Sequence, residues 1–130
     1  MTGQVLANAD VHRLVDLRLG LLRLHKTLLE MERINYEKIH GQVRSGELLQ
    51  LVLFNWLRMI SALVVEIDEA LDGDEPATLK DFDDLISEAH LLFTSPENEE
   101  FKTKYQAALQ SEPAVVMAHS AVMQLLRQAE

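Results

Sequence analysis

DVHRLVDLRLGLLRLHKTLLEMERINYEKIHG, residues 10–41, decides the fold of this chain. Its apolar residues recur at spacings of three and four, which is the period of an amphipathic α-helix. Asp10 is a residue type that commonly caps a helix start, and Gly41 is one that commonly ends a helix. The pattern predicts one long helix from Asp10 to His40, with a main apolar arc of Leu14, Leu17, Leu21, Leu24, Leu28 and Met31.

The rest of the chain repeats the same pattern in shorter pieces. Helices are predicted at 47–71, from Thr78 onward, at 96–110 and at 113–128. Thr78 with Asp81 three residues later resembles a capping box, and Ser95 before Pro96 is a typical helix start. Two long helices joined by a short turn pack antiparallel. The sequence therefore predicts an all-α, four-helix up-and-down-like bundle, with 96–110 as an extra short helix.

Composition indicates one domain without disulfides. The chain has 130 residues, is 48% hydrophobic and contains no cysteine. That size suits one core, and the missing cysteine excludes thiolate sites and cysteine nucleophiles. We predict a flexible N-terminus at 1–9 and a single domain at 10–130. The start MTGQVLANAD has no basic region followed by an apolar run, so we expect a cytoplasmic protein.

Charge is distributed unevenly along the chain, whose formal net charge is −9. Residues 1–65 carry 8 Lys or Arg and 6 Asp or Glu, whereas residues 66–130 carry 4 and 15. The two halves are therefore near +2 and −11. Because nucleic acids and anionic lipids attract basic surfaces, we expect neither as a partner. An acidic face either serves solubility or binds a basic protein partner.

The predicted second helix is apolar on nearly all sides. Its main arc includes Trp56, Ile60 and Leu63, but Leu51, Phe54 and Val65 lie on the opposite side. Arg58 near its centre argues against a membrane span. Such a helix either lies centrally in the bundle or meets another subunit. The second stripe of Leu51, Phe54 and Val65 thus predicts a homodimer interface.

Polar residues interrupt the apolar arc of the first helix. Arg18, His25 and Glu32 are spaced by seven residues, and Tyr36 follows on the same side. His119 falls among apolar residues of the last helix, and His90 lies at the edge of the third helix's arc. Buried ionisable groups are costly unless they are paired. We expect His25 and Glu32 to belong to an interior polar network, with His119 as the partner from a facing helix.

Three interpretations of these polar residues stay open. They form a structural network, they reach water at the bundle ends, or they bind a ligand or metal. Histidine and carboxylate suit Zn, Fe or Mn, and bundle cores hold such sites, although we expect no cofactor. The di-iron pattern fails, since Glu37–His40 is the one pair with that spacing and Glu37 points off the apolar face. Neither a phosphate-binding loop nor a nucleophile–base pair is present, so an enzyme is not favoured.

Three stretches resemble a family of small bacterial proteins. They are LHKTLLEMERINYEKIHG at 24–41, FNWLRMISALVVEIDEALD at 54–72 and YQAALQSEPAVVMAHSAV at 105–122. The resemblance implies a helical bundle and a bacterial origin, and it brings no assigned activity. The sequence therefore predicts a protein that acts by protein–protein interaction or homo-oligomerisation. The alternative is a metal- or small-ligand-binding bundle with a His/Glu site in its core.

Overall fold

The chain folds into helices throughout the part that the structure describes. A computed structural model describes residues 5–42 and 52–129, with the side chains of 52–54 left aside. Of the described residues, 86% are helical and none lies in a strand, which confirms the all-α prediction. The elements are α1 (Asn8–His40), the 3-10 helix η1 (Val52–Leu57), α3 (Arg58–Asp72), α4 (Leu79–Thr94), α5 (Glu99–Ser111) and α6 (Pro113–Ala129).

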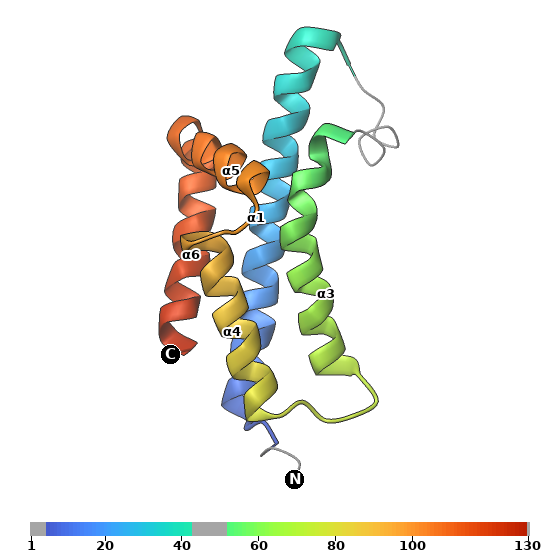
Figure 1. Ribbon diagram of the computed structural model, residues 1–130, viewed down its shortest axis with the longest axis vertical. Coiled ribbons are helices and arrows are strands. Elements are labelled where there is room, and N and C mark those ends of the chain that lie inside the picture. The colour runs from blue at the N-terminus through green and yellow to red at the C-terminus, as the bar shows by residue number, and fades with distance from the viewer. Residues whose placement is uncertain (1–4, 43–51, 130) are drawn as a thin grey trace.

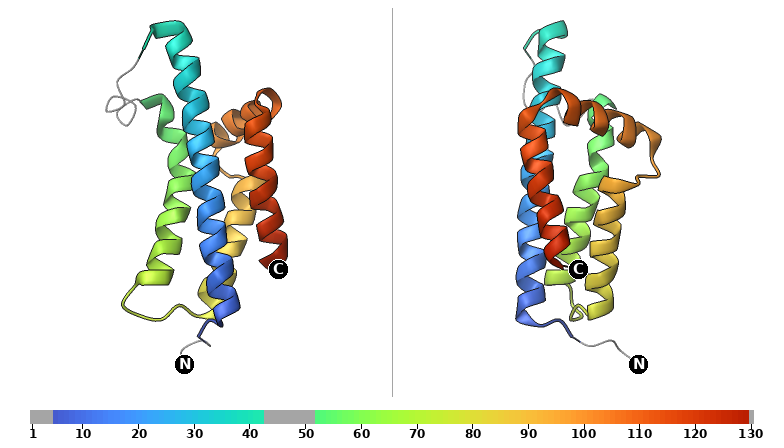
Figure 2. Two further views of the ribbon diagram at one scale, coloured as in Figure 1. Left: turned by 180° about the vertical axis from the view of Figure 1, so that it is seen from behind. Right: turned by 90° about the vertical axis from the view of Figure 1, so that its left-hand side faces the viewer.

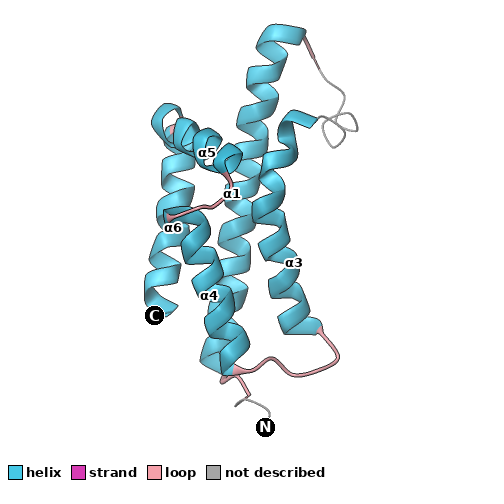
Figure 3. Cartoon of the chain, viewed as in Figure 1, coloured by secondary structure: helices cyan, strands magenta, loops and turns pink. Residues whose placement is uncertain are grey.

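Four helices run along the long axis of the molecule, and a fifth crosses one end. Figure 1 shows α1, α3, α4 and α6 side by side, alternating in direction, as predicted for an up-and-down bundle. α1 packs against α3 and α6, and α4 completes the ring by packing against the same two helices. α5 lies across the end of the bundle between α4 and α6, as the views in Figure 2 also show. Figure 3 shows that short loops join most of these helices.

The predicted arcs form the core. Five leucines of α1 are fully buried, and Met31 at the end of the predicted arc is half-buried. The main arc predicted for the second helix is buried from Trp56 to Ile67. Aromatic residues Phe93, Phe101 and Tyr105 close the end of the core beneath α5. Helical periodicity therefore predicted most of the core correctly, because each helix buries its apolar face in one shared core.

The start of α1 differs from the prediction. The helix begins at Asn8 after Ala7, and no side chain caps it. Asp10 lies within the first turn instead and forms an ion pair with Arg13. The residues before α1 contact the end of the loop between α3 and α4. Val5 pairs with Thr78, and Leu6 N donates to the carbonyl of Ala77. This contact fixes where the helix begins, so the prediction of Asp10 as N-cap was wrong.

Other helix ends follow the predicted chemistry in part. Gly41 ends α1 with φ of 85°, a conformation that favours glycine. Thr78 and Asp81 form the predicted capping box. Ser95 was wrongly predicted as an N-cap, since it terminates α4 and its N–H donates to Leu91 O. Asn98 caps α5 in its place, accepting a hydrogen bond from Phe101 N at 2.9 Å.

The second predicted helix is divided. Residues 47–51 lie outside the described residues, and the following six form η1 before α3 begins at Arg58. The prediction of a regular α-helix over 52–57 was therefore wrong in helix type. Within the described residues, no helix has both the length and the apolar character needed to cross a membrane.

Candidate functional site

The polar residues of α1 do not form a buried cluster. His25, Glu32 and Tyr36 are each half-buried, and no charged residue in the described part of the chain is fully buried. The Tyr36 ring lies 4.3 Å from that of His40, near the end of α1. No hydrogen bond joins His25 or Glu32 to another described residue. Partial burial alone lowers the pKa of His25. The expected network between His25, Glu32 and His119 is therefore not formed among these residues.

Arg18, the first member of the same line, has a partner on another helix. Its Nε lies 2.5 Å from Oδ1 of Asp68, which joins α1 to α3. Both side chains are partly exposed, so this pair contributes at most about 1 kcal/mol to stability. A surface ion pair thus accounts for Arg18, and no ligand or metal site is needed to explain this residue.

His119 forms its contact with Tyr105, a residue that was not among the candidate site residues predicted from the sequence. The Tyr105 hydroxyl lies 2.7 Å from Nδ1 of His119. Tyr105 is on α5 and His119 on α6, fourteen residues apart and on either side of the turn at Pro113. Because α5 crosses the end of the bundle, His119 contacts a residue of α5 and not the predicted partners on α1. Periodicity within one helix could not have shown this pairing.

Aromatic rings surround the Tyr105–His119 pair. Phe93 lies edge-on to His119 with ring centroids 6.2 Å apart, and Phe101 stacks on Tyr105 at 5.2 Å. Trp56 extends the group by contacting Phe101. This apolar surrounding raises the pKa of the Tyr105 phenol and lowers the pKa of the His119 imidazole, in both cases through burial. Burial therefore favours the neutral form of both the phenol and the imidazole.

A cavity of about 360 Å³ opens beside this pair, and we call it the corner cavity. The end of α4, one side of α5 and His119 of α6 line it. Its polar side chains include Lys102, Gln106, Tyr105 and His119, and no carboxylate of the described residues lines it. The volume is within the range of small-molecule sites. The arrangement can offer hydrogen bonds and one positive charge to a small molecule.

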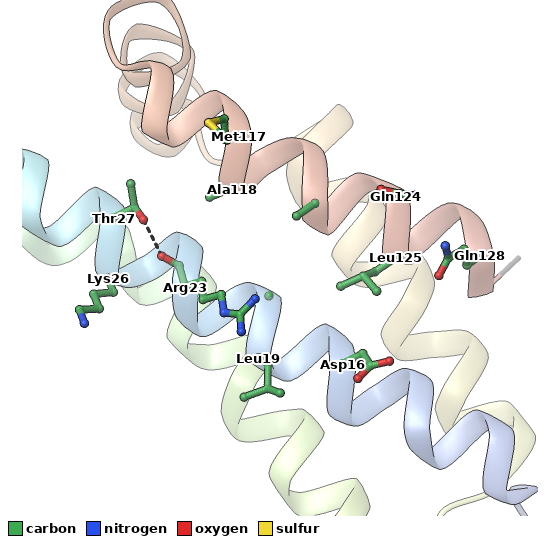
Figure 4. A pocket seen from close by; sticks show the side chains of 12 residues that line it. Asp16, Leu19, Arg23, Lys26, Thr27, Met117, Ala118, Gln124, Leu125 and Gln128 are labelled. Carbon is green, nitrogen blue, oxygen red and sulfur yellow. Dashed lines mark hydrogen bonds between the residues drawn. The ribbon is translucent and has the colours of Figure 1, made fainter.

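A second, larger hollow lies between α1 and α6. This groove of about 820 Å³ has the apolar lining residues Leu19, Gly20, Met117, Ala118, Ala121 and Leu125. Figure 4 shows Asp16, Arg23 and Thr27 on its α1 side and Gln124 and Gln128 on its α6 side. Gly20 permits the close approach of the two helices, since a Cβ there would lie 3.1 Å from Leu125 Cδ1. Leu19 and Met117 remain 44% and 74% exposed.

Acidic residues gather between α3 and α4. Six carboxylates line one cavity there: Glu66, Glu69, Glu75, Asp81, Asp84 and Glu88. A hydrogen bond with the neighbouring Glu88 carboxyl, aided by burial and repulsion, raises the pKa of Glu66 to about 7. These six carboxylates, which we call the acidic face, all come from the second half of the chain. Within the described residues, no three His, Cys, Asp or Glu side chains are arranged to hold a metal ion.

The remaining predicted residues lie apart from these features. His90 is half-buried on α4, and its carbonyl accepts a hydrogen bond from Thr94 Oγ1. Val65 is 53% exposed on α3. Leu51 and the side chain of Phe54 lie outside the described residues, so the structure leaves the stripe of Leu51, Phe54 and Val65 untested as an interface.

No family model, curated protein or solved structure matches this chain. The family resemblance drawn from the sequence therefore stays a prediction. The structural features that bear on function are the groove, the corner cavity and the acidic face.

Proposed function

We propose that this protein acts by protein–protein contact, as a homodimer formed through the outer face of α1 beside α6. One observation carries the proposal: α1 presents an exposed apolar stripe of Val15, Leu19 and Leu22, of which Leu19 also lines the groove. These residues share one side of the helix, at spacings of three, four and seven. Exposed apolar stripes of this kind mark contact surfaces more often than scattered single residues do.

Charge complementarity favours a second copy of this chain as the occupant. Asp16 and Arg23 lie seven residues apart, two turns along the same side of α1. In an antiparallel pair of α1 helices related by a twofold axis between positions 19 and 20, Asp16 of each copy lies opposite Arg23 of the other. A twofold interface requires such self-complementarity, because the same surface serves both partners. Leu19 then lies next to the axis.

The apolar stripe supplies the main part of the binding energy in this arrangement. Burial of apolar surface contributes about 25 cal/mol per Å², whereas a partly exposed ion pair contributes about 0.2–1 kcal/mol. The two Asp16–Arg23 pairs mainly set the antiparallel direction and register. Met117 adds apolar surface at the α6 side of the groove.

Light scattering on the purified protein at tens of micromolar tests the proposal. We expect twice the monomer mass, and a monomer after Leu19→Asp with helix content unchanged in circular dichroism. Leu91→Asp is the matched control, since Leu91 is a similarly exposed leucine on α4, at 57%. A monomeric wild-type protein would overturn the proposal. A dimer that Val65→Asp disrupts and Leu19→Asp leaves intact would place the interface on α3 instead.

A further inference from the structure

The corner cavity beside Tyr105 and His119 has the features of a ligand site that the proposed dimer does not use. It lies at the junction of α4, α5 and α6, away from the α1 stripe. Leu92, Phe93 and Leu109 provide its apolar walls. Lys102, Gln106 and His119 provide polar groups. Sites for small molecules combine these two kinds of lining: an apolar body with a few polar groups that orient the ligand.

The charge of the corner cavity is opposite to that of the molecule. The chain carries 21 Asp and Glu, yet none of those in residues 5–42 and 52–129 lines this cavity, whereas Lys102 does. By contrast, six carboxylates line the cavity between α3 and α4, and Asp16 lines the groove between α1 and α6. A negatively charged group thus meets one cation and no lining carboxylate at the corner cavity, which makes it suitable for an anion.

The Tyr105–His119 hydrogen bond prepares the imidazole to bind such a group. Nδ1 is occupied by the Tyr105 hydroxyl at 2.7 Å, so Nε2 is the ring nitrogen left for a ligand. If the buried phenol donates, Nδ1 accepts and the ring proton of the neutral imidazole resides on Nε2. Packing of Phe93 against the imidazole and of Phe101 against the phenol restricts rotation of both rings. Nε2–H is then a fixed donor, and fixed donors bind with less loss of entropy.

We propose that the corner cavity binds a small carboxylic acid with an apolar body. The carboxylate contacts the Lys102 ammonium and His119 Nε2–H, and the apolar body lies against Phe93 and Leu109. The site needs no metal and implies no reaction. Gln106 lines the same cavity and supplies an amide as a further hydrogen-bond donor.

Phenylacetate is a suitable probe, with neutral phenylacetamide as its isostere. NMR titration of the full chain would follow the imidazole signals of His119, assigned through their contacts with Tyr105. We expect a saturable shift with phenylacetate and at least about tenfold weaker binding of phenylacetamide, because the charge-assisted hydrogen bonds are lost. Equal affinity for the two molecules, or no saturable shift with phenylacetate, would overturn the proposal.

Variants at two lysines of α5 separate this site from general attraction of anions. Lys102→Gln removes an exposed cation that lines the cavity, and Lys104→Gln removes a half-buried cation of the same helix that does not line it. We expect Lys102→Gln to weaken phenylacetate binding about tenfold and to leave phenylacetamide binding unchanged. Lys104→Gln should leave both unchanged. Equal losses in the two variants would show nonspecific attraction and contradict the proposed site.

Discussion

The hydroxyl of Tyr105 lies 2.7 Å from Nδ1 of His119 and connects α5 to α6 at the end of the bundle. The bond lies within a cluster of rings that includes Phe93 and Phe101. Because Tyr105 is only 3% exposed, water cannot easily replace its partner. The partner of His119 is therefore this hydroxyl, and not the polar network along α1 that the sequence predicted.

Loss of the Tyr105 hydroxyl should destabilise the fold modestly. We expect Tyr105→Phe to lower the free energy of unfolding by about 1–3 kcal/mol, because the nitrogen of a half-buried imidazole loses its partner. His119→Leu removes the other partner, and the double variant should lose less than the sum of the two single variants. Urea unfolding at pH 7.5, where the imidazole is neutral, measures all three values.

Tyr36→Phe is the control for this cycle. Tyr36 is half-buried and its ring packs at a tilt against that of His40, and no hydrogen bond joins its hydroxyl to another described residue. Its change should stay within about 0.5 kcal/mol. Strictly additive effects of Tyr105→Phe and His119→Leu would show that the hydroxyl and the imidazole do not interact in solution.

The Glu66–Glu88 contact predicts a pH-dependent stability. The pKa of Glu66 is raised from 4.5 to about 7 in the folded chain. The folded state therefore holds a proton that the unfolded state releases, and the stabilisation present below pH 4.5 is lost as the pH rises through 7. Glu66→Gln keeps a hydrogen-bonding group without the charge. We expect it to raise the melting temperature at pH 8 and to change it little at pH 4.5.

Glu69→Gln provides the comparison for that experiment. It removes one negative charge from the same helix and the same acidic cavity but leaves the Glu66–Glu88 contact in place. Its effect at pH 8 should be smaller than that of Glu66→Gln. If both variants raise the melting temperature at pH 8 equally, the pH dependence arises from general repulsion across the acidic face. The proton shared by Glu66 and Glu88 would then not be its cause.

Features set by local chemistry could be predicted from the sequence. The apolar arc of α1 from Leu14 to Leu28 follows from a repeat of three and four residues, and the Thr78–Asp81 capping box from two residues alone. Ser95 and Asn98 show where local chemistry fails, since both residue types cap helices. The choice between them depends on how far α4 continues, which its packing against the core decides.

The candidate sites depend on how the helices are arranged in space. A helical wheel shows that His119 faces inward, but not that α5 crosses the bundle end and brings Tyr105 to it. The seven-residue spacing of Asp16 and Arg23 is visible in the sequence. Its meaning is not, because the sequence does not show which side of α1 the other three long helices leave uncovered.

Gly20 sets the distance between α1 and α6. A Cβ at this position would lie 3.1 Å from Leu125 Cδ1 and 3.4 Å from Val122 Cγ2, both ends of side chains. We expect Gly20→Ala to change stability by less than about 1 kcal/mol, since a gain in helix propensity of similar size offsets the crowding. Gly20→Leu should cost about 1–3 kcal/mol by overpacking the contact. Thermal unfolding at one fixed protein concentration measures both, and equal effects of the two variants would contradict a close helix contact.

Exchanging the charges of Asp16 and Arg23 tests the direction of the proposed dimer. Asp16→Arg alone places two arginines opposite each other at both ends of the antiparallel α1 pair, and Arg23→Asp alone places two aspartates there. Each single variant should weaken the dimer at least fivefold, because like charges replace two attractive pairs. The double variant, Asp16→Arg with Arg23→Asp, restores opposite charges at every position and should recover most of the affinity. Sedimentation over a range of concentrations measures the dissociation constants.

Recovery requires that residue 16 of one copy faces residue 23 of the other. In a parallel pair, where each residue faces its own equivalent, the double variant would be no better than the single ones, and the antiparallel arrangement would be wrong.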